Sequence, residues 1–195
     1  ANDMEFLRVI TDSELLDFLG FSYGTELGAT YAVLYPENVG LFVLDGAVDP
    51  TIDPDLALLG QIRGFDKALD AYLLDCFEQI SCPLPRDLSE AKDTIAGILA
   101  NLENGTLPTD YNRDLALSSA IAGIIVTLYS EDSWEYLSAG IEDALSGDGT
   151  MLLLLADFYN DRSSDDGYLT NLVEANYAIA CADEKTYPLS EKDLT

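Results

Sequence analysis

Histidine is absent from the 195-residue sequence, and basic residues are scarce, with nine lysines and arginines against 36 aspartates and glutamates. The formal net charge is −27, and the acidic residues are spread along the whole chain. A surface of this charge repels phosphate backbones and anionic lipids, so we expect neither nucleic acid nor a membrane as a partner. An acidic surface typical of secreted or halophilic proteins explains the charge without a cation site, and we expect no metal and no cofactor.

Long apolar runs are also absent. The longest stretches, residues 115–129 and 151–156, are shorter than the ~20 residues that a membrane-spanning helix needs. Yet 48% of the residues are hydrophobic and 10% are aromatic, which is typical of a packed interior and excludes a disordered chain. We therefore expect one ordinary domain, or a small core with a sizeable insertion, in which the apolar stretches form buried helices.

Cysteine is scarce too, and its spacing leaves two interpretations open. Cys76 and Cys82 flank a short segment at the end of an expected helix, directly before a proline. A disulfide across so short a loop would stabilise the fold by only roughly 2 kcal/mol, and two small buried thiols are the alternative. Neither a zinc-ligand spacing nor a redox Cys-x-x-Cys motif is present, and Cys181 is left over.

The hydrophobic pattern predicts a βαβ unit followed by helices. Residues 2–10 fit a short helix, residues 15–21 an almost unbroken apolar strand, residues 25–35 a helix, and residues 41–44 a second buried strand. From residue 50 onward the pattern predicts no further strand. The helices expected there cover residues 55–79, 88–102, 114–129, 133–145, 151–159 and 169–182.

The predicted sheet is unusually small. Two parallel strands leave two unpaired edges, an arrangement that is unstable in an isolated domain. We therefore expect either a larger fold around this unit or pairing of the edges with another copy of the chain, which would give a homo-oligomer.

The motif Gly20-Phe21-Ser22-Tyr23-Gly24 lies between the first predicted strand and the helix that follows it. The pattern G-x-S-x-G alone occurs by chance in about one chain in fifteen of this length, but a strand before it and a helix after it are what a nucleophile elbow requires. Ser22 is then the candidate nucleophile, and the backbone N–H of Tyr23 the candidate oxyanion donor. An ordinary serine in a glycine-rich turn remains the alternative.

The segment GFSYGTELGATYAVLYPENVGLFVLDGAVDP, residues 20–50, closely resembles the elbow region of α/β-hydrolase serine peptidases of the exported tripeptidyl aminopeptidase group, which are relatives of prolyl aminopeptidase. The resemblance continues more weakly through CPLP, the GDG before a helix that ends in LADFY, and AIACAD. It spans nearly all of the chain.

This resemblance implies an α/β fold of which the chain holds a mostly helical part. Residues 1–50 would be a partial α/β-hydrolase core, residues 51–184 an all-helical cap, and residues 185–195 a polar tail or linker. Ser22 would be acylated, Tyr23 would supply one oxyanion N–H, and peptides with free N-termini would be the substrates. The parent protein would be secreted or lie in the bacterial cell envelope.

One departure from that family is large. Its catalytic triad runs Ser, then Asp or Glu, then His, and the 195 residues contain no histidine. Asp45 and Asp49 follow the second predicted strand, but a carboxylate with a pKa near ~4 is poorly matched to deprotonating a serine, and turn residues around them favour a structural role.

We therefore expect a serine peptidase fragment that is inactive alone, with a complementing second chain as a less favoured variant. The alternative is a non-catalytic acidic helical module that binds a protein partner and retains the elbow as inherited structure.

Overall fold

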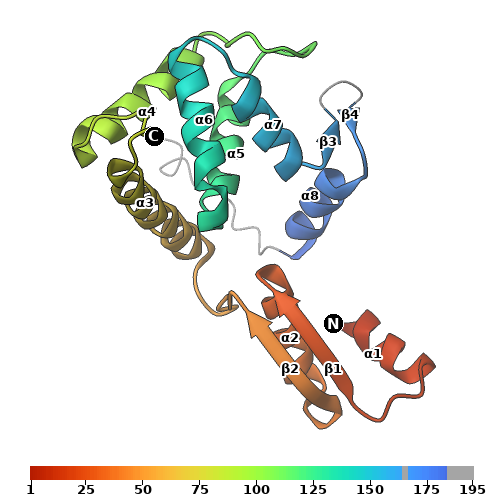
Figure 1. The fold of residues 1–195 in the computed structure, drawn as a ribbon. Helices are drawn as coiled ribbons and strands as arrows, with labels where there is room; N and C mark the ends of the chain where they lie inside the picture. The colour runs from red at the N-terminus through yellow and green to blue at the C-terminus, as the bar shows by residue number, and fades with distance from the viewer. Residues whose placement is uncertain (164–166, 184–195) are drawn as a thin grey trace, which may run out of the picture. The chain divides into compact units, whose positions relative to one another are not determined.

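The computed structural model describes residues 1–163 and 167–183. It divides into two compact units, Ala1–Gln61 and Ile62–Thr195 (Figure 1). The division falls inside helix α3 (Pro54–Glu78), later than residue 50, where the sequence predicts the change from core to cap. The predicted tail at residues 185–195 lies outside the described residues. Among the helices that the structure describes, none is both long enough and apolar enough to cross a membrane.

The first unit contains the predicted βαβ arrangement, and this part of the fold prediction is confirmed. Strands β1 (Leu16–Phe21) and β2 (Val39–Asp45) pair in parallel, with Gly20 opposite Leu44. The remaining elements before α3 are α1 (Asn2–Ile10), α2 (Tyr23–Leu34) and the 3-10 turn η1 (Pro36–Asn38). Helix α2 starts directly after Ser22, which is two residues earlier than predicted.

Helix α2 packs closely on one face of the strand pair. Gly28 is buried against the sheet, and a Cβ there would lie 2.8 Å from side-chain atoms of both Phe18 and Leu44, so a larger residue would force these side chains to shift. Tyr31 is fully buried beside Phe42, with ring centroids 5.8 Å apart. The small residues of α2 thus set the distance between helix and sheet.

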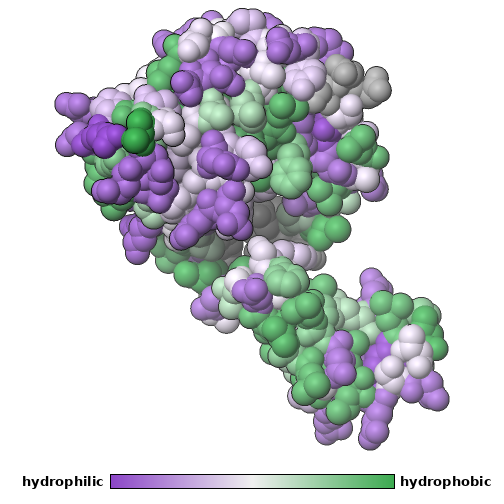
Figure 2. Space-filling view, in the orientation of Figure 1, coloured by the Kyte–Doolittle hydropathy of each residue, from purple (hydrophilic) through white to green (hydrophobic). Residues whose placement is uncertain are grey.

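The other face of the strand pair is open. Its apolar side chains Leu19, Phe21, Leu41 and Val43 are exposed, and Figure 2 shows hydrophobic residues gathered over β1 and β2. Strands as apolar as these are normally covered by other elements on both faces of a parallel sheet. In the described residues only the α2 face is covered, and this face is exposed.

A polar network fixes α1 to the rest of the first unit. Glu5 accepts hydrogen bonds from Arg8 at 2.7 and 3.0 Å, from the Tyr31 hydroxyl at 2.7 Å and from Asn38 Nδ2 at 3.0 Å. The Arg8 hydrogen bond, followed by that of Tyr31, lowers the pKa of Glu5 to about 2. Arg8 also donates to the Ser13 carbonyl at 2.5 Å, so it joins the helix to the segment that leads into β1.

The second unit is a helical bundle with its own core. Its elements after α3 are α4 (Leu88–Leu102), α5 (Leu117–Thr127), the 3-10 turn η2 (Glu131–Ser133), α6 (Trp134–Leu145), α7 (Thr150–Tyr159), β3 (Arg162–Ser163), β4 (Gly167–Tyr168) and α8 (Leu172–Asp183). Leu73, Leu137, Ile141 and Leu153 are fully buried in the core. A Cβ on Gly123 of α5 would overlap the Leu152 carbonyl of α7, so glycine at this position lets the two helices approach closely.

The expectation that no strand follows residue 50 is wrong. β3 and β4 form an antiparallel pair, and a further bridge joins Leu107 and Leu115 through two backbone hydrogen bonds of 3.0 and 2.8 Å. Each strand of the pair has only two residues, too few to show the alternating pattern by which strands are recognised. The Arg162 guanidinium lies 5.2 Å from the centre of the Tyr168 ring and stabilises the pair through a cation–π contact.

The three cysteines differ in state. Cys76 and Cys82 form a disulfide that joins the end of α3 to the segment before α4, with their Cα atoms 5.2 Å apart. Cys181 is free and exposed.

An ion pair anchors the segment before α5 to α7. Arg113 donates to Asp157, whose side chain is only 6% exposed. Lys92 instead joins Asp66 and Asp70 near the surface, and the Asp66 side chain is 62% exposed. The Arg113–Asp157 pair is therefore more buried than the Lys92–Asp66 pair.

Replacing Arg113→Met should destabilise the protein by about 3 kcal/mol, since it leaves the buried Asp157 carboxylate without its cation. Asp66→Asn removes a partner from the exposed pair and should cost less than about 1 kcal/mol. Urea unfolding of both variants and the parent measures the difference. Equal unfolding midpoints for the two variants would contradict the anchoring role of Arg113.

The Glu5 network should make α1 sensitive to acid. The folded-state pKa of Glu5 lies below its ordinary value of 4.5, so its contribution is present above that pH and is lost as the pH falls toward 2. As the pH is lowered from 5 to 2, the amides of α1 should therefore lose protection, so that their exchange rates rise relative to the intrinsic rates at each pH. The variant Glu5→Gln should lose this pH dependence, whereas Glu37→Gln on η1 should keep it. A parent protein whose α1 protection does not change over this range would exclude the network as the cause.

Candidate functional site

Ser22 occupies a sharp turn between β1 and α2. β1 ends at Phe21, α2 begins at Tyr23, and Ser22 itself has φ 49° and ψ −119°. A positive φ is uncommon for residues other than glycine and costs about 1–3 kcal/mol at strained sites. The Ser22 side chain is exposed, so a strained backbone presents an accessible hydroxyl.

Hydrogen bonds to neighbouring segments hold this turn. The Ser22 N–H donates to the Asp45 carbonyl at the end of β2, at 2.9 Å. The Ser22 carbonyl accepts from the Thr25 N–H at 2.9 Å and from the Thr25 hydroxyl at 2.7 Å. Gly46, with φ 68°, carries the chain past the turn, where a Cβ on Gly46 would lie 3.7 Å from Ser22 N.

The two motif glycines have different surroundings. A Cβ on Gly20 would lie 2.6 Å from both the Gly24 carbonyl oxygen and the Phe18 ring, so no other residue fits without a shift. A Cβ on Gly24 would meet no described atom within 4 Å. Glycine is therefore required by its surroundings at position 20, and the described residues supply no such steric reason at position 24.

The electrostatic setting favours negative charge next to Ser22. Tyr23 is the first residue of α2, so its N–H is directed toward the N-terminal end of the helix, where the positive end of the helix dipole lies. An oxyanion that develops beside Ser22 would face this end of the helix.

The carboxylate of Asp49, in the loop after β2, is engaged by Thr51. Asp49 accepts hydrogen bonds from the Thr51 hydroxyl at 2.7 Å and the Thr51 N–H at 2.8 Å, and these lower the pKa of Asp49. A lowered pKa makes this group a weaker base, so it is poorly suited to activating a serine. Asp45 takes part in the turn through its backbone carbonyl.

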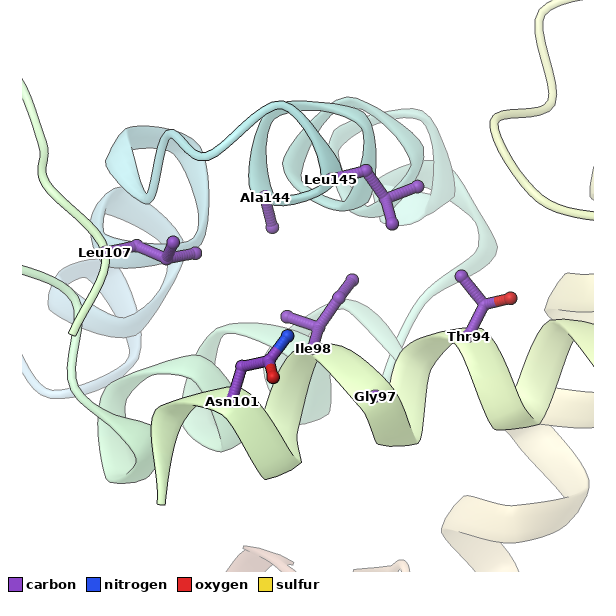
Figure 3. A pocket seen from close by; sticks show the side chains of 7 residues that line it. All are labelled: Thr94, Gly97, Ile98, Asn101, Leu107, Ala144 and Leu145. Atoms are coloured by element: carbon purple, nitrogen blue, oxygen red, sulfur yellow. The ribbon is translucent and has the colours of Figure 1, made fainter. Parts of the chain in front are cut away.

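Two of the hollows that the described residues form lie in the second unit, and Ser22 lines neither of them. The first, of about 280 Å³, is formed mainly by α4 and α6 (Figure 3). Ile98 and Thr94 rise from α4 toward Ala144 and Leu145 of α6, and the lining carries no charged side chain. It therefore offers shape and apolar contact without an acid, base or nucleophile.

The second hollow, of about 550 Å³, is acidic. It lies beside the disulfide, and its lining includes the rings of Tyr72 and Trp134 and four carboxylates, those of Asp75, Glu131, Asp132 and Glu135. Across the described residues there is no group of three or more His, Cys, Asp or Glu side chains placed to hold a metal ion.

Sequence reasoning missed two contributors to the turn, Thr25 and Val48. The Thr25 hydroxyl accepts a hydrogen bond from the Val48 N–H at 2.8 Å while it donates to Ser22. Thr25 is the last residue of the SYGT segment, residues 22–25, which lies within the stretch that resembles the peptidases. No pattern in the sequence connects Thr25 with Val48, 23 residues later.

Comparison with known proteins agrees with this geometry. Residues 1–162 match the alpha/beta hydrolase fold family. Serine protease Hip1 of Mycobacterium tuberculosis is 36% identical over 200 residues, which cover 99% of the chain and 38% of that protein. Carboxylesterase B of M. tuberculosis is 35% identical over 150 residues, 76% of the chain and 29% of that protein.

A shorter match connects the chain with a tripeptidyl aminopeptidase of Streptomyces lividans, which is 42% identical over 53 residues, 27% of the chain and 10% of that protein. The chain thus spans less than two fifths of the length of these relatives. From the family match, the relatives and the serine turn together, the chain belongs to the α/β-hydrolase fold family, among its serine hydrolases and peptidases.

Proposed function

We propose that the chain is the nucleophile-bearing part of a serine exopeptidase that releases short peptides from free N-termini. The observation that carries the proposal is the positive φ of Ser22 between β1 and α2. The strained turn presents an exposed hydroxyl at a helix N-terminus, as a nucleophile elbow does. Substrate preference for free N-termini is supported by the resemblance of residues 20–50 to aminopeptidases and by the match with the Streptomyces enzyme.

In this proposal the Ser22 hydroxyl attacks the carbonyl carbon of a peptide bond. The Tyr23 N–H donates to the oxygen of the tetrahedral intermediate, the amine leaves with a proton, and the acyl group stays on Ser22 until water removes it. Acylation needs a base to take the serine proton and an acid to deliver a proton to the leaving amine. Deacylation needs a base to take a proton from water and an acid to return one to the serine oxygen. The 195 residues contain no histidine, and the Asp49 carboxylate has a lowered pKa.

We therefore propose that the histidine and its acidic partner come from outside these residues, and that the chain alone does not turn over substrate. In the same proposal the protein acts outside the cytoplasm, in the medium or the cell envelope. The strongly acidic composition and the Cys76–Cys82 disulfide are compatible with an oxidising environment.

A second candidate is a non-catalytic acidic module that binds a protein partner. It is favoured by one observation, the separate hydrophobic core of the second unit with its own disulfide. Under this candidate Ser22 is inherited structure. The first unit, with its open sheet, would then have to be stable by itself.

A fluorophosphonate probe tests whether a base activates Ser22 as a nucleophile. We expect no stoichiometric labelling of the folded chain, because without a base the Ser22 hydroxyl is not deprotonated at neutral pH. Intact-mass spectrometry measures the labelled fraction, with Ser22→Ala as the control and circular dichroism to show that both proteins are folded. Labelling of one site per chain that disappears in the control would show that another group activates Ser22.

We also propose that isolated chains associate through the open face and edges of the β1–β2 pair. Leu41 on this face is 77% exposed, and Leu41→Glu should move the chain toward the monomer in sedimentation velocity at tens of micromolar. Val33 on α2 is 80% exposed and Val33→Glu, which adds the same charge, should leave the association unchanged. A parent chain that sediments as a monomer would refute the proposal.

A further inference from the structure

Thr25 lies at the centre of the contacts around Ser22. It belongs to the first turn of α2 and is 1% exposed. Its hydroxyl donates to the Ser22 carbonyl at 2.7 Å and accepts from the Val48 N–H at 2.8 Å, so both functions of the hydroxyl are used. Thr25 thus joins three segments, namely the serine turn, the helix and the loop that follows β2.

The second of these hydrogen bonds distinguishes Thr25 from an ordinary helical threonine. Thr127 of α5 is equally buried, and its hydroxyl donates to the Ile124 carbonyl at 2.7 Å, three residues back. Such back-bonding is the usual behaviour of threonine in helices. Among the described residues none donates to the Thr127 hydroxyl, whereas Thr25 also accepts from a residue 23 positions away.

The carbonyl that Thr25 holds belongs to a peptide group that matters for catalysis. The Ser22 carbonyl and the Tyr23 N–H are the two ends of one planar trans peptide, because the structure has no cis peptide bond among the described residues. A donor that fixes the carbonyl therefore also fixes the direction of the Tyr23 N–H on the opposite side. Thr25 supplies two such donors, its N–H at 2.9 Å and its hydroxyl.

We infer that Thr25 is a positioning residue that orients the Ser22–Tyr23 peptide, and with it the oxyanion donor, against the loop after β2. The inference deepens the proposed function and rests on it, since orientation of this peptide matters for acyl transfer only if Ser22 is the nucleophile. The Val48 N–H keeps the Thr25 hydroxyl turned so that its proton points to Ser22. The loop at Gly46–Val48 is in this way coupled to the site through the Thr25 hydroxyl.

The test measures how well position 22 stabilises negative charge and needs no turnover. Ser22→Cys is made together with Cys181→Ser, so that the thiol at position 22 is the one left to react while Cys76 and Cys82 stay in their disulfide. The rate of alkylation by iodoacetamide at pH 7, divided by the rate at pH 10, reports the thiolate fraction and cancels differences in access.

Adding Thr25→Val should lower this ratio by about threefold or more, because a thiolate at a helix N-terminus depends on correctly directed N–H donors. Valine keeps the shape of threonine without the hydroxyl. Thr25→Ser restores the hydroxyl and should return the ratio to within about twofold of the parent. Thr127→Val, the matched change at a buried threonine, should leave the ratio unchanged.

An unchanged ratio in Thr25→Val overturns the inference, and so does an equal loss in Thr127→Val. If circular dichroism shows that Thr25→Val does not fold, Thr25→Ser decides, since a parent-like ratio supports the inference and a reduced one overturns it. Failure of the proposal that the chain alone lacks an activating base is seen separately, as full labelling of the wild-type chain by the fluorophosphonate probe, and does not depend on these alkylation rates.

Discussion

The strained backbone of Ser22 is the constraint on which the first unit depends. Its positive φ is compensated by the hydrogen bond from the Ser22 N–H to the Asp45 carbonyl and by the two donors from Thr25. Each hydrogen bond contributes about 1 kcal/mol net, which is comparable to the cost of the strained conformation. The turn can therefore persist only while β1, α2 and the end of β2 keep their relative positions. This explains why Gly20 and Gly28, which allow α2 to approach the sheet, are as much a part of the site as the serine.

The same unit is incomplete as a sheet. One face of β1 and β2 is covered by α2, and the other exposes Leu19, Phe21, Leu41 and Val43. Parallel strands in α/β proteins are normally covered on both faces. The relatives are more than twice as long as the chain, whose described residues contain one pair of parallel strands. An exposed apolar face and a serine without a base are thus both explained if further segments complete the sheet and the site together.

Much of the fold could be predicted from the sequence, and the errors have physical causes. Helices α1 and α4 have the predicted bounds, because the spacing of their apolar residues defines them locally. The start of α4 is also defined by Asp87, whose side chain caps the helix. The β3–β4 pair was missed because two-residue strands depend on backbone hydrogen bonds and on the contact of Arg162 with Tyr168, which leave no periodic pattern. At the site, the motif located Ser22 and Tyr23, whereas the bridge from Thr25 to Val48 is a tertiary contact that no local pattern encodes.

A high-resolution crystal structure of the chain would test the central claim most directly, by measuring the conformation of Ser22 and the surroundings of the Thr25 hydroxyl. The account predicts a positive φ at Ser22, with the Thr25 oxygen within hydrogen-bond distance of both the Ser22 carbonyl and the Val48 nitrogen. Ser22 in an ordinary helical or extended conformation, with the loop after β2 separated from Thr25, would contradict it. In that case the serine turn would be a plain connection between a strand and a helix.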